Sequence, residues 1–371
     1  MKLALVYDRV NKWGGAERVL AALHEIWPDA PLYTSVYSPD TAQWANGWQV
    51  NTTFLQNIPL PKNKHEYYPF LMGPAFETLS FDNYDVVISV THEFAKAIIT
   101  KPKTLHICYC LTPASYLWEP GYSQYFYEKD SLKLISGPLV KYLRWYDKII
   151  AQRPDEYVAI SKTVQNRINN IYGRDSEIIY PPVSINLITN SQSSITNDQY
   201  FLIVSRLVPN KRVDIAIKAF NELGWPLKII GVGSEYKSLK RLGNKNVEFL
   251  GFLTNEEVIS YYERCRAVVV CGEEDFNIVA VEAQGYGKPV VAFGRGGCTE
   301  TVISGRTGYF FEEQRVSSLV RTLRAVNLET ILSEDCVNNA KNYHCDQFKK
   351  EFRDYVLERF RQHLRNLQKS S

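Results

Sequence analysis

The sequence predicts an α/β fold organised as two units. Short runs of β-branched residues alternate with stretches of helical periodicity, a pattern typical of parallel sheets covered by helices. The length of 371 residues corresponds to about two domains. A polar stretch without periodicity, residues 183–199, follows Pro181 and Pro182, and we interpret it as the linker between the units.

Apolar runs bounded by polar residues predict the elements of the first unit, residues 1–182. Ser161 precedes the last helical stretch, and its hydroxyl is suited to cap the first N–H groups of a helix. We expect strands at Leu3–Tyr7, Asp85–Val90, Leu105–Cys110, Glu156–Ile160 and Glu177–Tyr180, and helices at Ala16–Ile26 and Lys162–Tyr172.

The same patterns predict a second unit over residues 200–345, followed by a helix in residues 346–371. Thr254 and Glu257 have the spacing of a capping box. The final helix has aromatic and aliphatic residues on one face and mostly basic residues on the other; it either packs on the body or lies on a membrane surface. We expect strands at Tyr200–Ser205, Leu227–Gly231, Val247–Leu250, Ala267–Cys271 and Pro289–Phe293, and helices at Val213–Leu223, Asn255–Arg264 and Ile278–Gly285.

Charge and hydropathy exclude several classes of protein. Lys and Arg number 43 and Asp and Glu number 40, so a net charge of +3 provides no strong overall attraction to nucleic acid. No apolar run is long enough to cross a membrane, and the run at the amino terminus is too short for a signal-peptide core. The seven cysteines are odd in number and lie in apolar segments, which favours reduced thiols in a cytoplasmic protein.

The loop between the predicted strand ending at Cys271 and the helix beginning at Ile278 is the first candidate site. Loops at the carboxyl ends of parallel strands bind ligands in open α/β sheets. The backbone amides of Asn277, Ile278 and Val279 would bind an anion at the helix start. Glu274 and Glu282 would accept hydrogen bonds from sugar hydroxyls, or they are merely solvated surface charges.

A second candidate lies in Ser205–Lys211, directly after the first strand of the second unit. The guanidinium of Arg206 and the ammonium of Lys211 suit a diphosphate, although both side chains could equally be solvated loop cations. Because this loop and the Glu274 loop leave the carboxyl ends of strands in one sheet, we expect them at the same edge.

The first unit offers weaker signals. Gly14 and Gly15 follow the first strand and would let the backbone come close to a ligand, and His92 follows another strand, so a site role and a structural role both remain open. His106, Cys108 and Cys110 share one face of a strand, where a buried polar strand is favoured over a metal cluster.

Missing motifs exclude further classes. The chain has no P-loop, no Gly-x-Ser-x-Gly elbow and no Asp-x-Asp motif, and Gly231-Val-Gly233 is followed by Tyr236 where a dinucleotide fingerprint needs glycine or alanine. We therefore expect neither a cofactor nor a metal. A diphosphate bound without metal must be neutralised by cations and helix amides.

Taken together, these segments resemble the retaining glycosyltransferases of family 4. The resemblance implies a GT-B fold, with two Rossmann-like α/β/α domains facing a central cleft, the first binding the acceptor and the second the nucleotide sugar. It also implies that the last helix crosses back to the first domain. The resemblance rests on Glu274 and Glu282 with Asp275-Phe276 between them, Arg206 and Lys211, Gly14-Gly15, and Gly296-Gly297-x-x-Glu300.

Three further segments narrow the resemblance to mannosyltransferases that build bacterial O-antigen and exopolysaccharide repeats. These segments are Asn51–Gln56, His106–Cys110 and Ser205–Pro209. The implied reaction transfers a sugar, which we expect to be mannose from GDP-mannose, to a lipid-linked or soluble saccharide with retention of configuration. The departing diphosphate is stabilised by cations and amides and accepts the proton of the acceptor hydroxyl.

The resemblance also assigns roles to individual residues. By this resemblance, Glu282 holds the ribose, Glu274 holds the donor hexose, and Arg206 and Lys211 hold the diphosphate. The sugar and phosphates are also bound by the backbone amides of Phe276, Asn277, Ile278 and Val279. In the first domain, Gly14 and Gly15 approach the diphosphate and His92 lies by the donor sugar. Glu274, His92, Arg206 and Lys211 are the residues we expect to act in catalysis.

Two positions depart from the family pattern. Asn277 stands where glycine is usual, and asparagine tolerates left-handed backbone and caps helices well. Leu111 stands where a histidine is common, which affects acceptor handling or activity. These two departures leave open a nucleotide-sugar-binding partner without transferase activity. A transferase with a UDP-sugar donor is a further alternative, because no segment of the sequence identifies the base of the nucleotide.

A basic and aromatic stretch, residues 62–72, has two interpretations. It is either buried helix surface or a segment in peripheral contact with the inner face of the plasma membrane, where a lipid-linked acceptor would be found.

Overall fold

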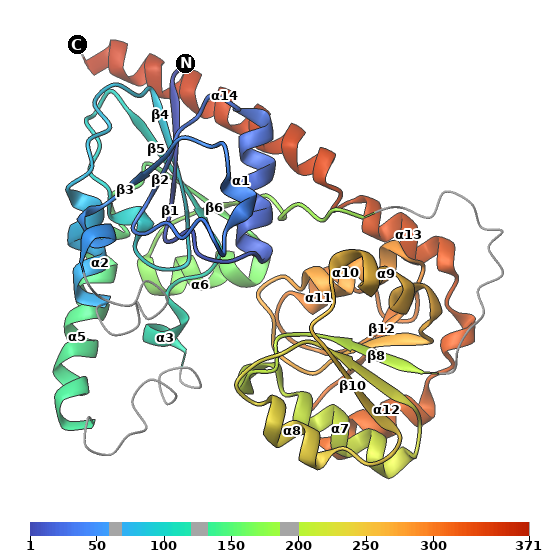
Figure 1. Cartoon of the computed structure of the whole chain (residues 1–371). Coiled ribbons are helices and arrows are strands. Elements are labelled where there is room, and N and C mark those ends of the chain that lie inside the picture. The colour runs from blue at the N-terminus through green and yellow to red at the C-terminus, as the bar shows by residue number, and fades with distance from the viewer. Residues whose placement is uncertain (59–68, 120–132, 186–199, 371) are drawn as a thin grey trace. The chain divides into compact units, whose positions relative to one another are not determined.

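The computed structural model describes residues 1–58, 69–119, 133–185 and 200–370 and divides the chain into two compact units (Figure 1). The first unit consists of residues 1–182 and 345–371, and the second of residues 183–344. Each unit is a parallel sheet covered by helices, which confirms the predicted α/β class and the two Rossmann-like units. Most of the predicted linker, residues 186–199, lies outside the described residues.

The sheet of the first unit has the strand order β3-β2-β1-β4-β5-β6-β7. All of its pairings are parallel, and β1 lies between β2 and β4. The strands are β1 (Leu3–Tyr7), β2 (Leu32–Thr34), β3 (Val50–Thr52), β4 (Val86–Thr91), β5 (Leu105–Cys110), β6 (Glu156–Ala159) and β7 (Glu177–Ile178).

Capping residues mark both ends of helix α6 (Lys162–Tyr172) in the first unit. The Ser161 hydroxyl accepts a hydrogen bond from the N–H of Val164 at 3.1 Å, as expected, and Gly173 ends the same helix in left-handed backbone with φ 65°. The helices are α1 (Gly15–Ile26), α2 (Pro69–Glu77), α3 (Ser115–Trp118), α5 (Lys133–Ile150), α6 (Lys162–Tyr172) and α14 (Cys345–Ser370).

Helix α14, although last in the chain, packs on the first unit. The Phe352 side chain is fully buried, with its ring centroid 6.3 Å from that of Trp27 and 5.4 Å from that of Tyr109 on β5. Lys349 and Glu25 at the end of α1 form an ion pair at 2.5 Å. The chain therefore ends in the unit in which it begins (Figure 1).

The sheet of the second unit has the order β10-β9-β8-β11-β12-β13, again with parallel pairings. Phe201 and Ile203 face one core cluster and Leu202 faces the other, so β8 is buried on both faces. The strands are β8 (Phe201–Val204), β9 (Leu227–Ile230), β10 (Val247–Gly251), β11 (Ala267–Val270), β12 (Val290–Phe293) and β13 (Gly308–Phe311).

The predicted capping box of the second unit is present at α9. The Thr254 hydroxyl accepts from the N–H of Glu257 at 3.3 Å, and the Glu257 carboxylate accepts from the N–H of Thr254 at 2.7 Å. The helices are α7 (Val213–Leu223), α8 (Tyr236–Leu242), α9 (Asn255–Arg264), α10 (Ile278–Gly285), α11 (Cys298–Thr301), α12 (Val316–Ala325) and α13 (Ser333–Lys341).

The structure differs from the sequence prediction in several elements. Strands β2, β3 and β13 were not predicted, and the strand predicted to reach Tyr180 ends at Ile178. Val183 pairs with His344, and a Cβ on Gly285 would lie 2.0 Å from Ile185, so residues 183–185 pack in the second unit and are not linker. Residues 62–68 of the stretch considered for membrane contact lie outside the described residues.

Each sheet has one point where the connections diverge. Connections from β1 and β4 lead to opposite halves of the first sheet, and those from β8 and β11 do the same in the second. Ligands in open α/β sheets bind at such points, outside the carboxyl ends of the strands. The two switch points therefore define where a site is sought in each unit.

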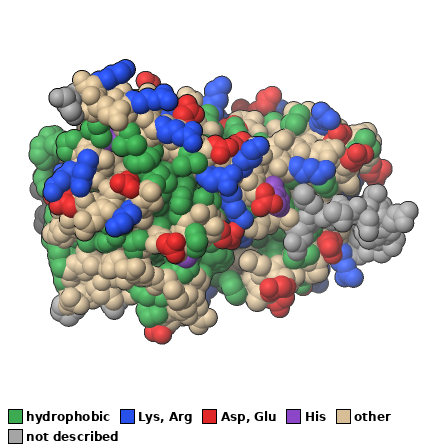
Figure 2. Space-filling model, turned by 90° about the horizontal axis from the view of Figure 1, so that it is seen from above, with side chains coloured by type: hydrophobic (Ala, Val, Ile, Leu, Met, Phe, Trp, Pro, Cys, Tyr) green, Lys and Arg blue, Asp and Glu red, His purple; other side chains and the backbone are tan. Residues whose placement is uncertain are grey.

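The surface agrees with the near-neutral charge balance. On the face shown in Figure 2, basic and acidic side chains are interspersed among hydrophobic ones. None of the helices in the described part of the chain is long and apolar enough to cross a membrane.

Candidate active site

The second-unit cluster comprises Arg206, Lys211, Glu274, residues 276–279 and Glu282. Its two loops follow β8 and β11, which pair in parallel with Phe201 opposite Ala267. Both loops therefore leave the same edge of the sheet, at its switch point, as the sequence predicts.

Lys211 and Glu274 are paired with each other. The Lys211 ammonium donates to Oε2 of Glu274, and the two side chains are only 16% and 18% exposed. Arg206, by contrast, is exposed and makes no ion pair within the described residues. The cluster thus contains one solvent-facing cation and one cation that is already neutralised, an arrangement that the spacing of the residues could not show.

The amino terminus of α10 is formed by Asn277 in left-handed backbone, with φ 77° and ψ 76°. Its side-chain oxygen accepts from the N–H of Ala280 at 3.1 Å, which caps the helix as expected of asparagine. Its amide nitrogen donates to the sulfur of Cys298 at 2.9 Å. Ile278 and Val279 occupy the first turn, where helical N–H groups have no acceptor within the helix and are suited to an anion.

Glycines keep the backbones of this cluster close together. A Cβ on Gly297 would lie 2.4 Å from Cα of Phe276, and one on Gly296 would lie 2.4 Å from the carbonyl oxygen of Glu274. The N–H of Gly297 donates to that carbonyl at 2.6 Å. Any side chain at these positions would displace the Glu274 loop, which explains the paired glycines.

Glu282 and Phe276 both contact aromatic side chains of the second unit. Glu282, on α10, accepts a hydrogen bond from the Tyr262 hydroxyl at 3.0 Å, and the Tyr262 ring stacks on Tyr286 at 5.5 Å. Phe276 is 3% exposed and its ring lies 5.4 Å from that of Tyr343. The backbone of Phe276, rather than its ring, is therefore the part that can face a ligand.

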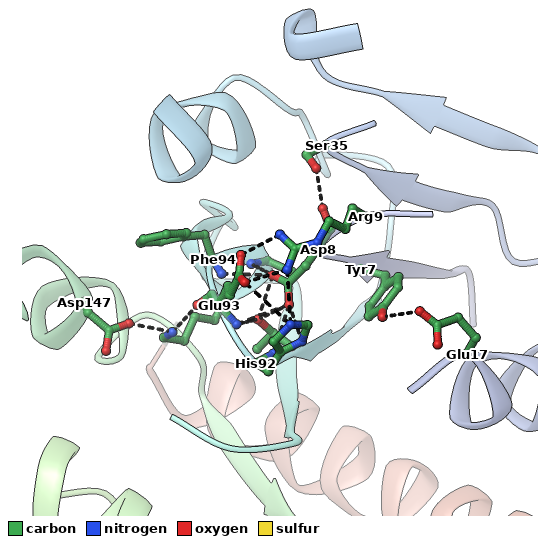
Figure 3. Close-up of polar contacts among 12 residues, drawn as sticks. Tyr7, Asp8, Arg9, Glu17, Ser35, His92, Glu93, Phe94 and Asp147 are labelled. Atoms are coloured by element: carbon green, nitrogen blue, oxygen red, sulfur yellow. Dashed lines mark hydrogen bonds and ion pairs between the residues drawn. The ribbon is translucent and has the colours of Figure 1, made fainter. Parts of the chain in front are cut away.

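The first-unit cluster comprises Asp8, Arg9, His92 and Glu93, drawn in Figure 3. Asp8 follows β1 and His92 follows β4, and these strands pair in parallel at the switch point of the first sheet. Of the four residues, only His92 was predicted from the sequence.

The Asp8 carboxylate organises the turn after β4. It is fully buried, and its oxygens accept hydrogen bonds from the Thr91 hydroxyl at 2.9 Å and from four consecutive backbone N–H groups. These N–H groups belong to His92, Glu93, Phe94 and Ala95, at 2.9, 3.2, 2.9 and 2.8 Å. Hydrogen bonds from so many donors fix the turn after β4 around this one carboxylate.

The His92 ring has a partner at each nitrogen (Figure 3). Nδ1 lies 3.3 Å from Oδ2 of Asp8, and Nε2 lies 3.2 Å from Nη2 of Arg9. Burial lowers the pKa of His92 against the opposing charges of Glu93 and Asp8. A neutral ring with its proton on Nδ1 satisfies both contacts, because Asp8 then accepts from Nδ1 and Arg9 donates to Nε2.

Arg9 and Glu93 form a buried bidentate pair. The Arg9 guanidinium donates to both Glu93 oxygens, at 2.7 and 2.5 Å, and its side chain is 3% exposed. Lys96, also buried, pairs with Asp147 at 2.7 Å and donates to the carbonyl of Glu93. Paired charges therefore fix both the side chain and the carbonyl of Glu93.

Gly14 and Gly15 lie at the start of α1, after β1. The Gly14 backbone is extended, and a Cβ there would lie 3.1 Å from a Glu17 oxygen. Glu17 is buried and accepts from the Tyr7 hydroxyl at 2.6 Å. The glycine thus leaves room for this buried carboxylate.

His106, Cys108 and Cys110 are buried in β5. His106 Nε2 lies 2.8 Å from the Ser89 hydroxyl. Among the residues that the structure describes, no group of three or more His, Cys, Asp or Glu side chains could hold a metal ion.

The sequence approach found part of this arrangement and missed part. It placed Lys211 and Glu274 at one edge and His92 at another, and the structure agrees. Asp8, Arg9 and Glu93 were missed, although Asp8 and Arg9 directly follow a strand, the same signal that singled out His92.

Two parallel-sheet units with polar clusters at their switch points have the GT-B fold of known glycosyltransferases. Anabaena HepE in complex with UDP superimposes with a TM-score of 0.70 at 20% identity, covering 96% of this chain and 100% of that chain. At this identity the likeness concerns the fold alone.

Sequence comparison gives more specific information for the second unit than the fold does. Residues 185–343 match the family model described as glycosyl transferases group 1. An uncharacterized glycosyltransferase of Methanocaldococcus jannaschii is 31% identical over 51% of this chain and 54% of its own length. A GDP-mannose-dependent phosphatidylinositol monomannoside mannosyltransferase of Mycolicibacterium smegmatis is 32% identical over 28% of this chain and 32% of its own length. The chain spans about half the length of the curated relatives that it matches first.

Replacing Asp8 by asparagine is predicted to destabilise the first unit by about 3 kcal/mol, because each buried N–H that loses its acceptor costs about 1–3 kcal/mol. Urea unfolding monitored by circular dichroism measures the effect. Asp82→Asn is the matched control, since Asp82 is 49% exposed and pairs with exposed Lys101. Equal unfolding midpoints for the two variants would contradict the assigned role of Asp8.

The stability of the first unit should fall as the pH falls below the ordinary histidine range. Burial, aided by the charges of Arg153 and Arg174, lowers the pKa of His106 to about 3, so its protonation favours the unfolded chain, where the pKa is about 6.5. Between pH 7.5 and 5.5, wild type should lose about 1.4 kcal/mol more free energy of unfolding than His106→Gln. Equal losses in urea titrations at the two pH values would refute this.

Proposed function

We propose that this protein is a retaining, metal-independent glycosyltransferase. In this proposal it moves mannose from GDP-mannose to a lipid-linked or soluble saccharide during the synthesis of bacterial surface polysaccharide. The observation that supports it most is the second-unit cluster, which places Arg206, the Lys211–Glu274 pair and the amino terminus of α10 at one switch point. This cluster lies within the segment that matches glycosyl transferases group 1.

Each group of the second-unit cluster has a role in the proposed reaction. Arg206 and Lys211 neutralise the diphosphate, aided by the amides at the start of α10. Glu274 accepts hydrogen bonds from hydroxyls of the donor hexose, and Glu282 from the ribose. When the donor binds, its diphosphate competes with Glu274 for the Lys211 ammonium, while its sugar hydroxyls give Glu274 new donors.

The first-unit cluster has a supporting role in the same reaction. Gly14 and Gly15 would approach the diphosphate, and His92 would lie by the donor sugar. Because Asp8 and Arg9 engage both ring nitrogens, His92 would contribute a fixed, neutral ring and its backbone rather than a mobile proton.

The proposed chemistry is stabilisation of the leaving group. As the bond between the anomeric carbon and the diphosphate oxygen lengthens, charge grows on the diphosphate, where the cations and amides lie. The acceptor hydroxyl forms the new bond from the same face of the sugar, and its proton passes to the departing phosphate. The products are the glycosylated acceptor and the nucleoside diphosphate.

We also propose that the protein acts at the cytoplasmic face of the plasma membrane through peripheral contact. An acceptor carried on a lipid remains in the bilayer, so the enzyme would have to reach it there.

Lys211→Ala is predicted to lower donor turnover by about 10²–10³-fold, because it removes a charge that stabilises the leaving group. Slow hydrolysis of labelled GDP-mannose measures turnover without knowledge of the acceptor. Lys218→Ala, on the exposed side of α7, is the matched control and should turn over normally. Near-normal turnover by a folded Lys211→Ala protein would refute the assignment. Nucleotide binding without any hydrolysis or transfer by wild type would favour the alternative of a binding partner without activity.

GDP should raise the melting temperature more than UDP at equal concentration, since a ligand present at 100 times its Kd stabilises a protein by about 2.7 kcal/mol. Thermal-shift titrations with both nucleotides make the comparison. The similar proteins do not decide between the two nucleotides, because the mycobacterial enzyme is GDP-mannose-dependent and the structure of HepE contains UDP. A larger shift with UDP would transfer the proposal to a UDP-sugar donor.

A further inference from the structure

Helix α5 of the first unit has an unusual exposed face. Tyr142, Trp145 and Ile149 are 45%, 58% and 41% exposed, and their spacing places them on one side of the helix. Lys141 and Lys148 are exposed beside them. The opposite side, with Leu143 and Ile150, is fully buried in the core, so the helix is firmly held while its aromatic side faces solvent.

No carboxylate balances the cations of this face within the described residues. Lys141, Arg144 and Lys148 make no ion pair there. The one acidic residue of α5, Asp147, is fully buried and pairs with Lys96 on the inner side. The face is therefore basic and aromatic without a negative charge.

Neighbouring elements continue and support the same surface. A Cβ on Gly73 of α2 would lie 2.2 Å from the Tyr146 ring, so α2 packs directly on α5, as Figure 1 shows. Phe70, one turn before Gly73, is 45% exposed. On α3, the Trp118 ring lies 5.5 Å from the Arg144 guanidinium and 5.4 Å from the Lys148 ammonium, which holds both cations near the helix.

We propose that the exposed face of α5 docks the protein on a bilayer that contains anionic lipid. Lysine and arginine attract acidic head groups, and tryptophan and tyrosine favour the boundary between head groups and acyl chains. A protein partner would have to supply carboxylates matched to each cation, whereas an anionic bilayer presents negative charge all over its surface. The purpose of the contact, access to a lipid-linked acceptor, rests on the proposed function; the contact itself does not.

The exposed end of α14 is a weaker candidate for the same role. Its basic residues Arg361 and Arg365 are exposed, but Glu358 lines the same groove, and Leu364 is its one large hydrophobic side chain exposed among the described residues. The two helices therefore provide a matched comparison, since both carry exposed cations and only α5 carries exposed aromatic rings among them.

The test is co-sedimentation of the full chain with vesicles of phosphatidylcholine, with and without phosphatidylglycerol, at low and high salt. Wild type should bind only the vesicles with phosphatidylglycerol, and salt should weaken this binding. Lys141→Gln with Lys148→Gln should lower the partition coefficient about 25-fold, at about fivefold for each cation. Trp145→Ala should lower it at least about fivefold, because it removes a ring that enters the interface.

Arg361→Gln with Arg365→Gln is the control on α14 and should change the partition coefficient less than about twofold. The proposal is overturned if this control loses as much binding as the α5 variant, if wild type binds phosphatidylcholine alone equally well, or if it binds neither vesicle. It is also overturned if sedimentation velocity shows a dimer that Trp145→Ala separates, because the face would then bind a second copy. Donor hydrolysis measured without lipid should be unchanged in the α5 variants, so failure of the docking surface and failure of the transferase are distinguishable.

Discussion

Parallel strand pairing is the constraint on which the remaining structure depends. Because every described pairing in both sheets is parallel, the carboxyl ends of the strands meet at one edge of each sheet. Residues far apart in sequence, such as Asp8 and His92 or Lys211 and Glu274, come together for this reason alone. The same pairing requires helices on the sheet faces, so the strands are buried on both sides and polar chemistry is confined to the loops at their ends.

The two clusters use this edge differently. In the first unit, buried charges are paired within the chain, with Asp8 held by backbone N–H groups and Arg9 by Glu93, so the cluster is rigid and self-contained. In the second unit, Arg206 faces solvent and the loops approach through glycine, leaving backbone and charge available to a ligand. A rigid first-unit cluster and an adaptable second-unit cluster suit the proposed division between positioning groups and diphosphate-binding groups.

The sequence predicts helices best where a local signal marks their ends. Bounds of α6, α7, α9 and α10 agree with the prediction, and Ser161, Thr254 and Asn277 cap three of these helices. The three-residue strands β2 and β3 were missed because so few residues give no periodicity, and their pairing is decided by neighbours distant in sequence. The sequence predicted at which edge of the sheet the site residues lie, but not which side chains contact one another. The pairing of Lys211 with Glu274 and the four N–H groups bound by Asp8 depend on side-chain directions, which residue spacing does not reveal.

If the second-unit cluster binds the proposed donor, the Lys211–Glu274 pair would make it selective before any ligand arrives. A simple anion such as inorganic phosphate gains the Lys211 ammonium only by stranding a carboxylate that is 18% exposed, and it has no hydroxyl to offer in return. A molecule that combines an anion with hydroxyl donors can exchange partners with both side chains at once. In the proposed donor site, the ion pair would therefore favour ligands that are at the same time phosphate and sugar over simple phosphate.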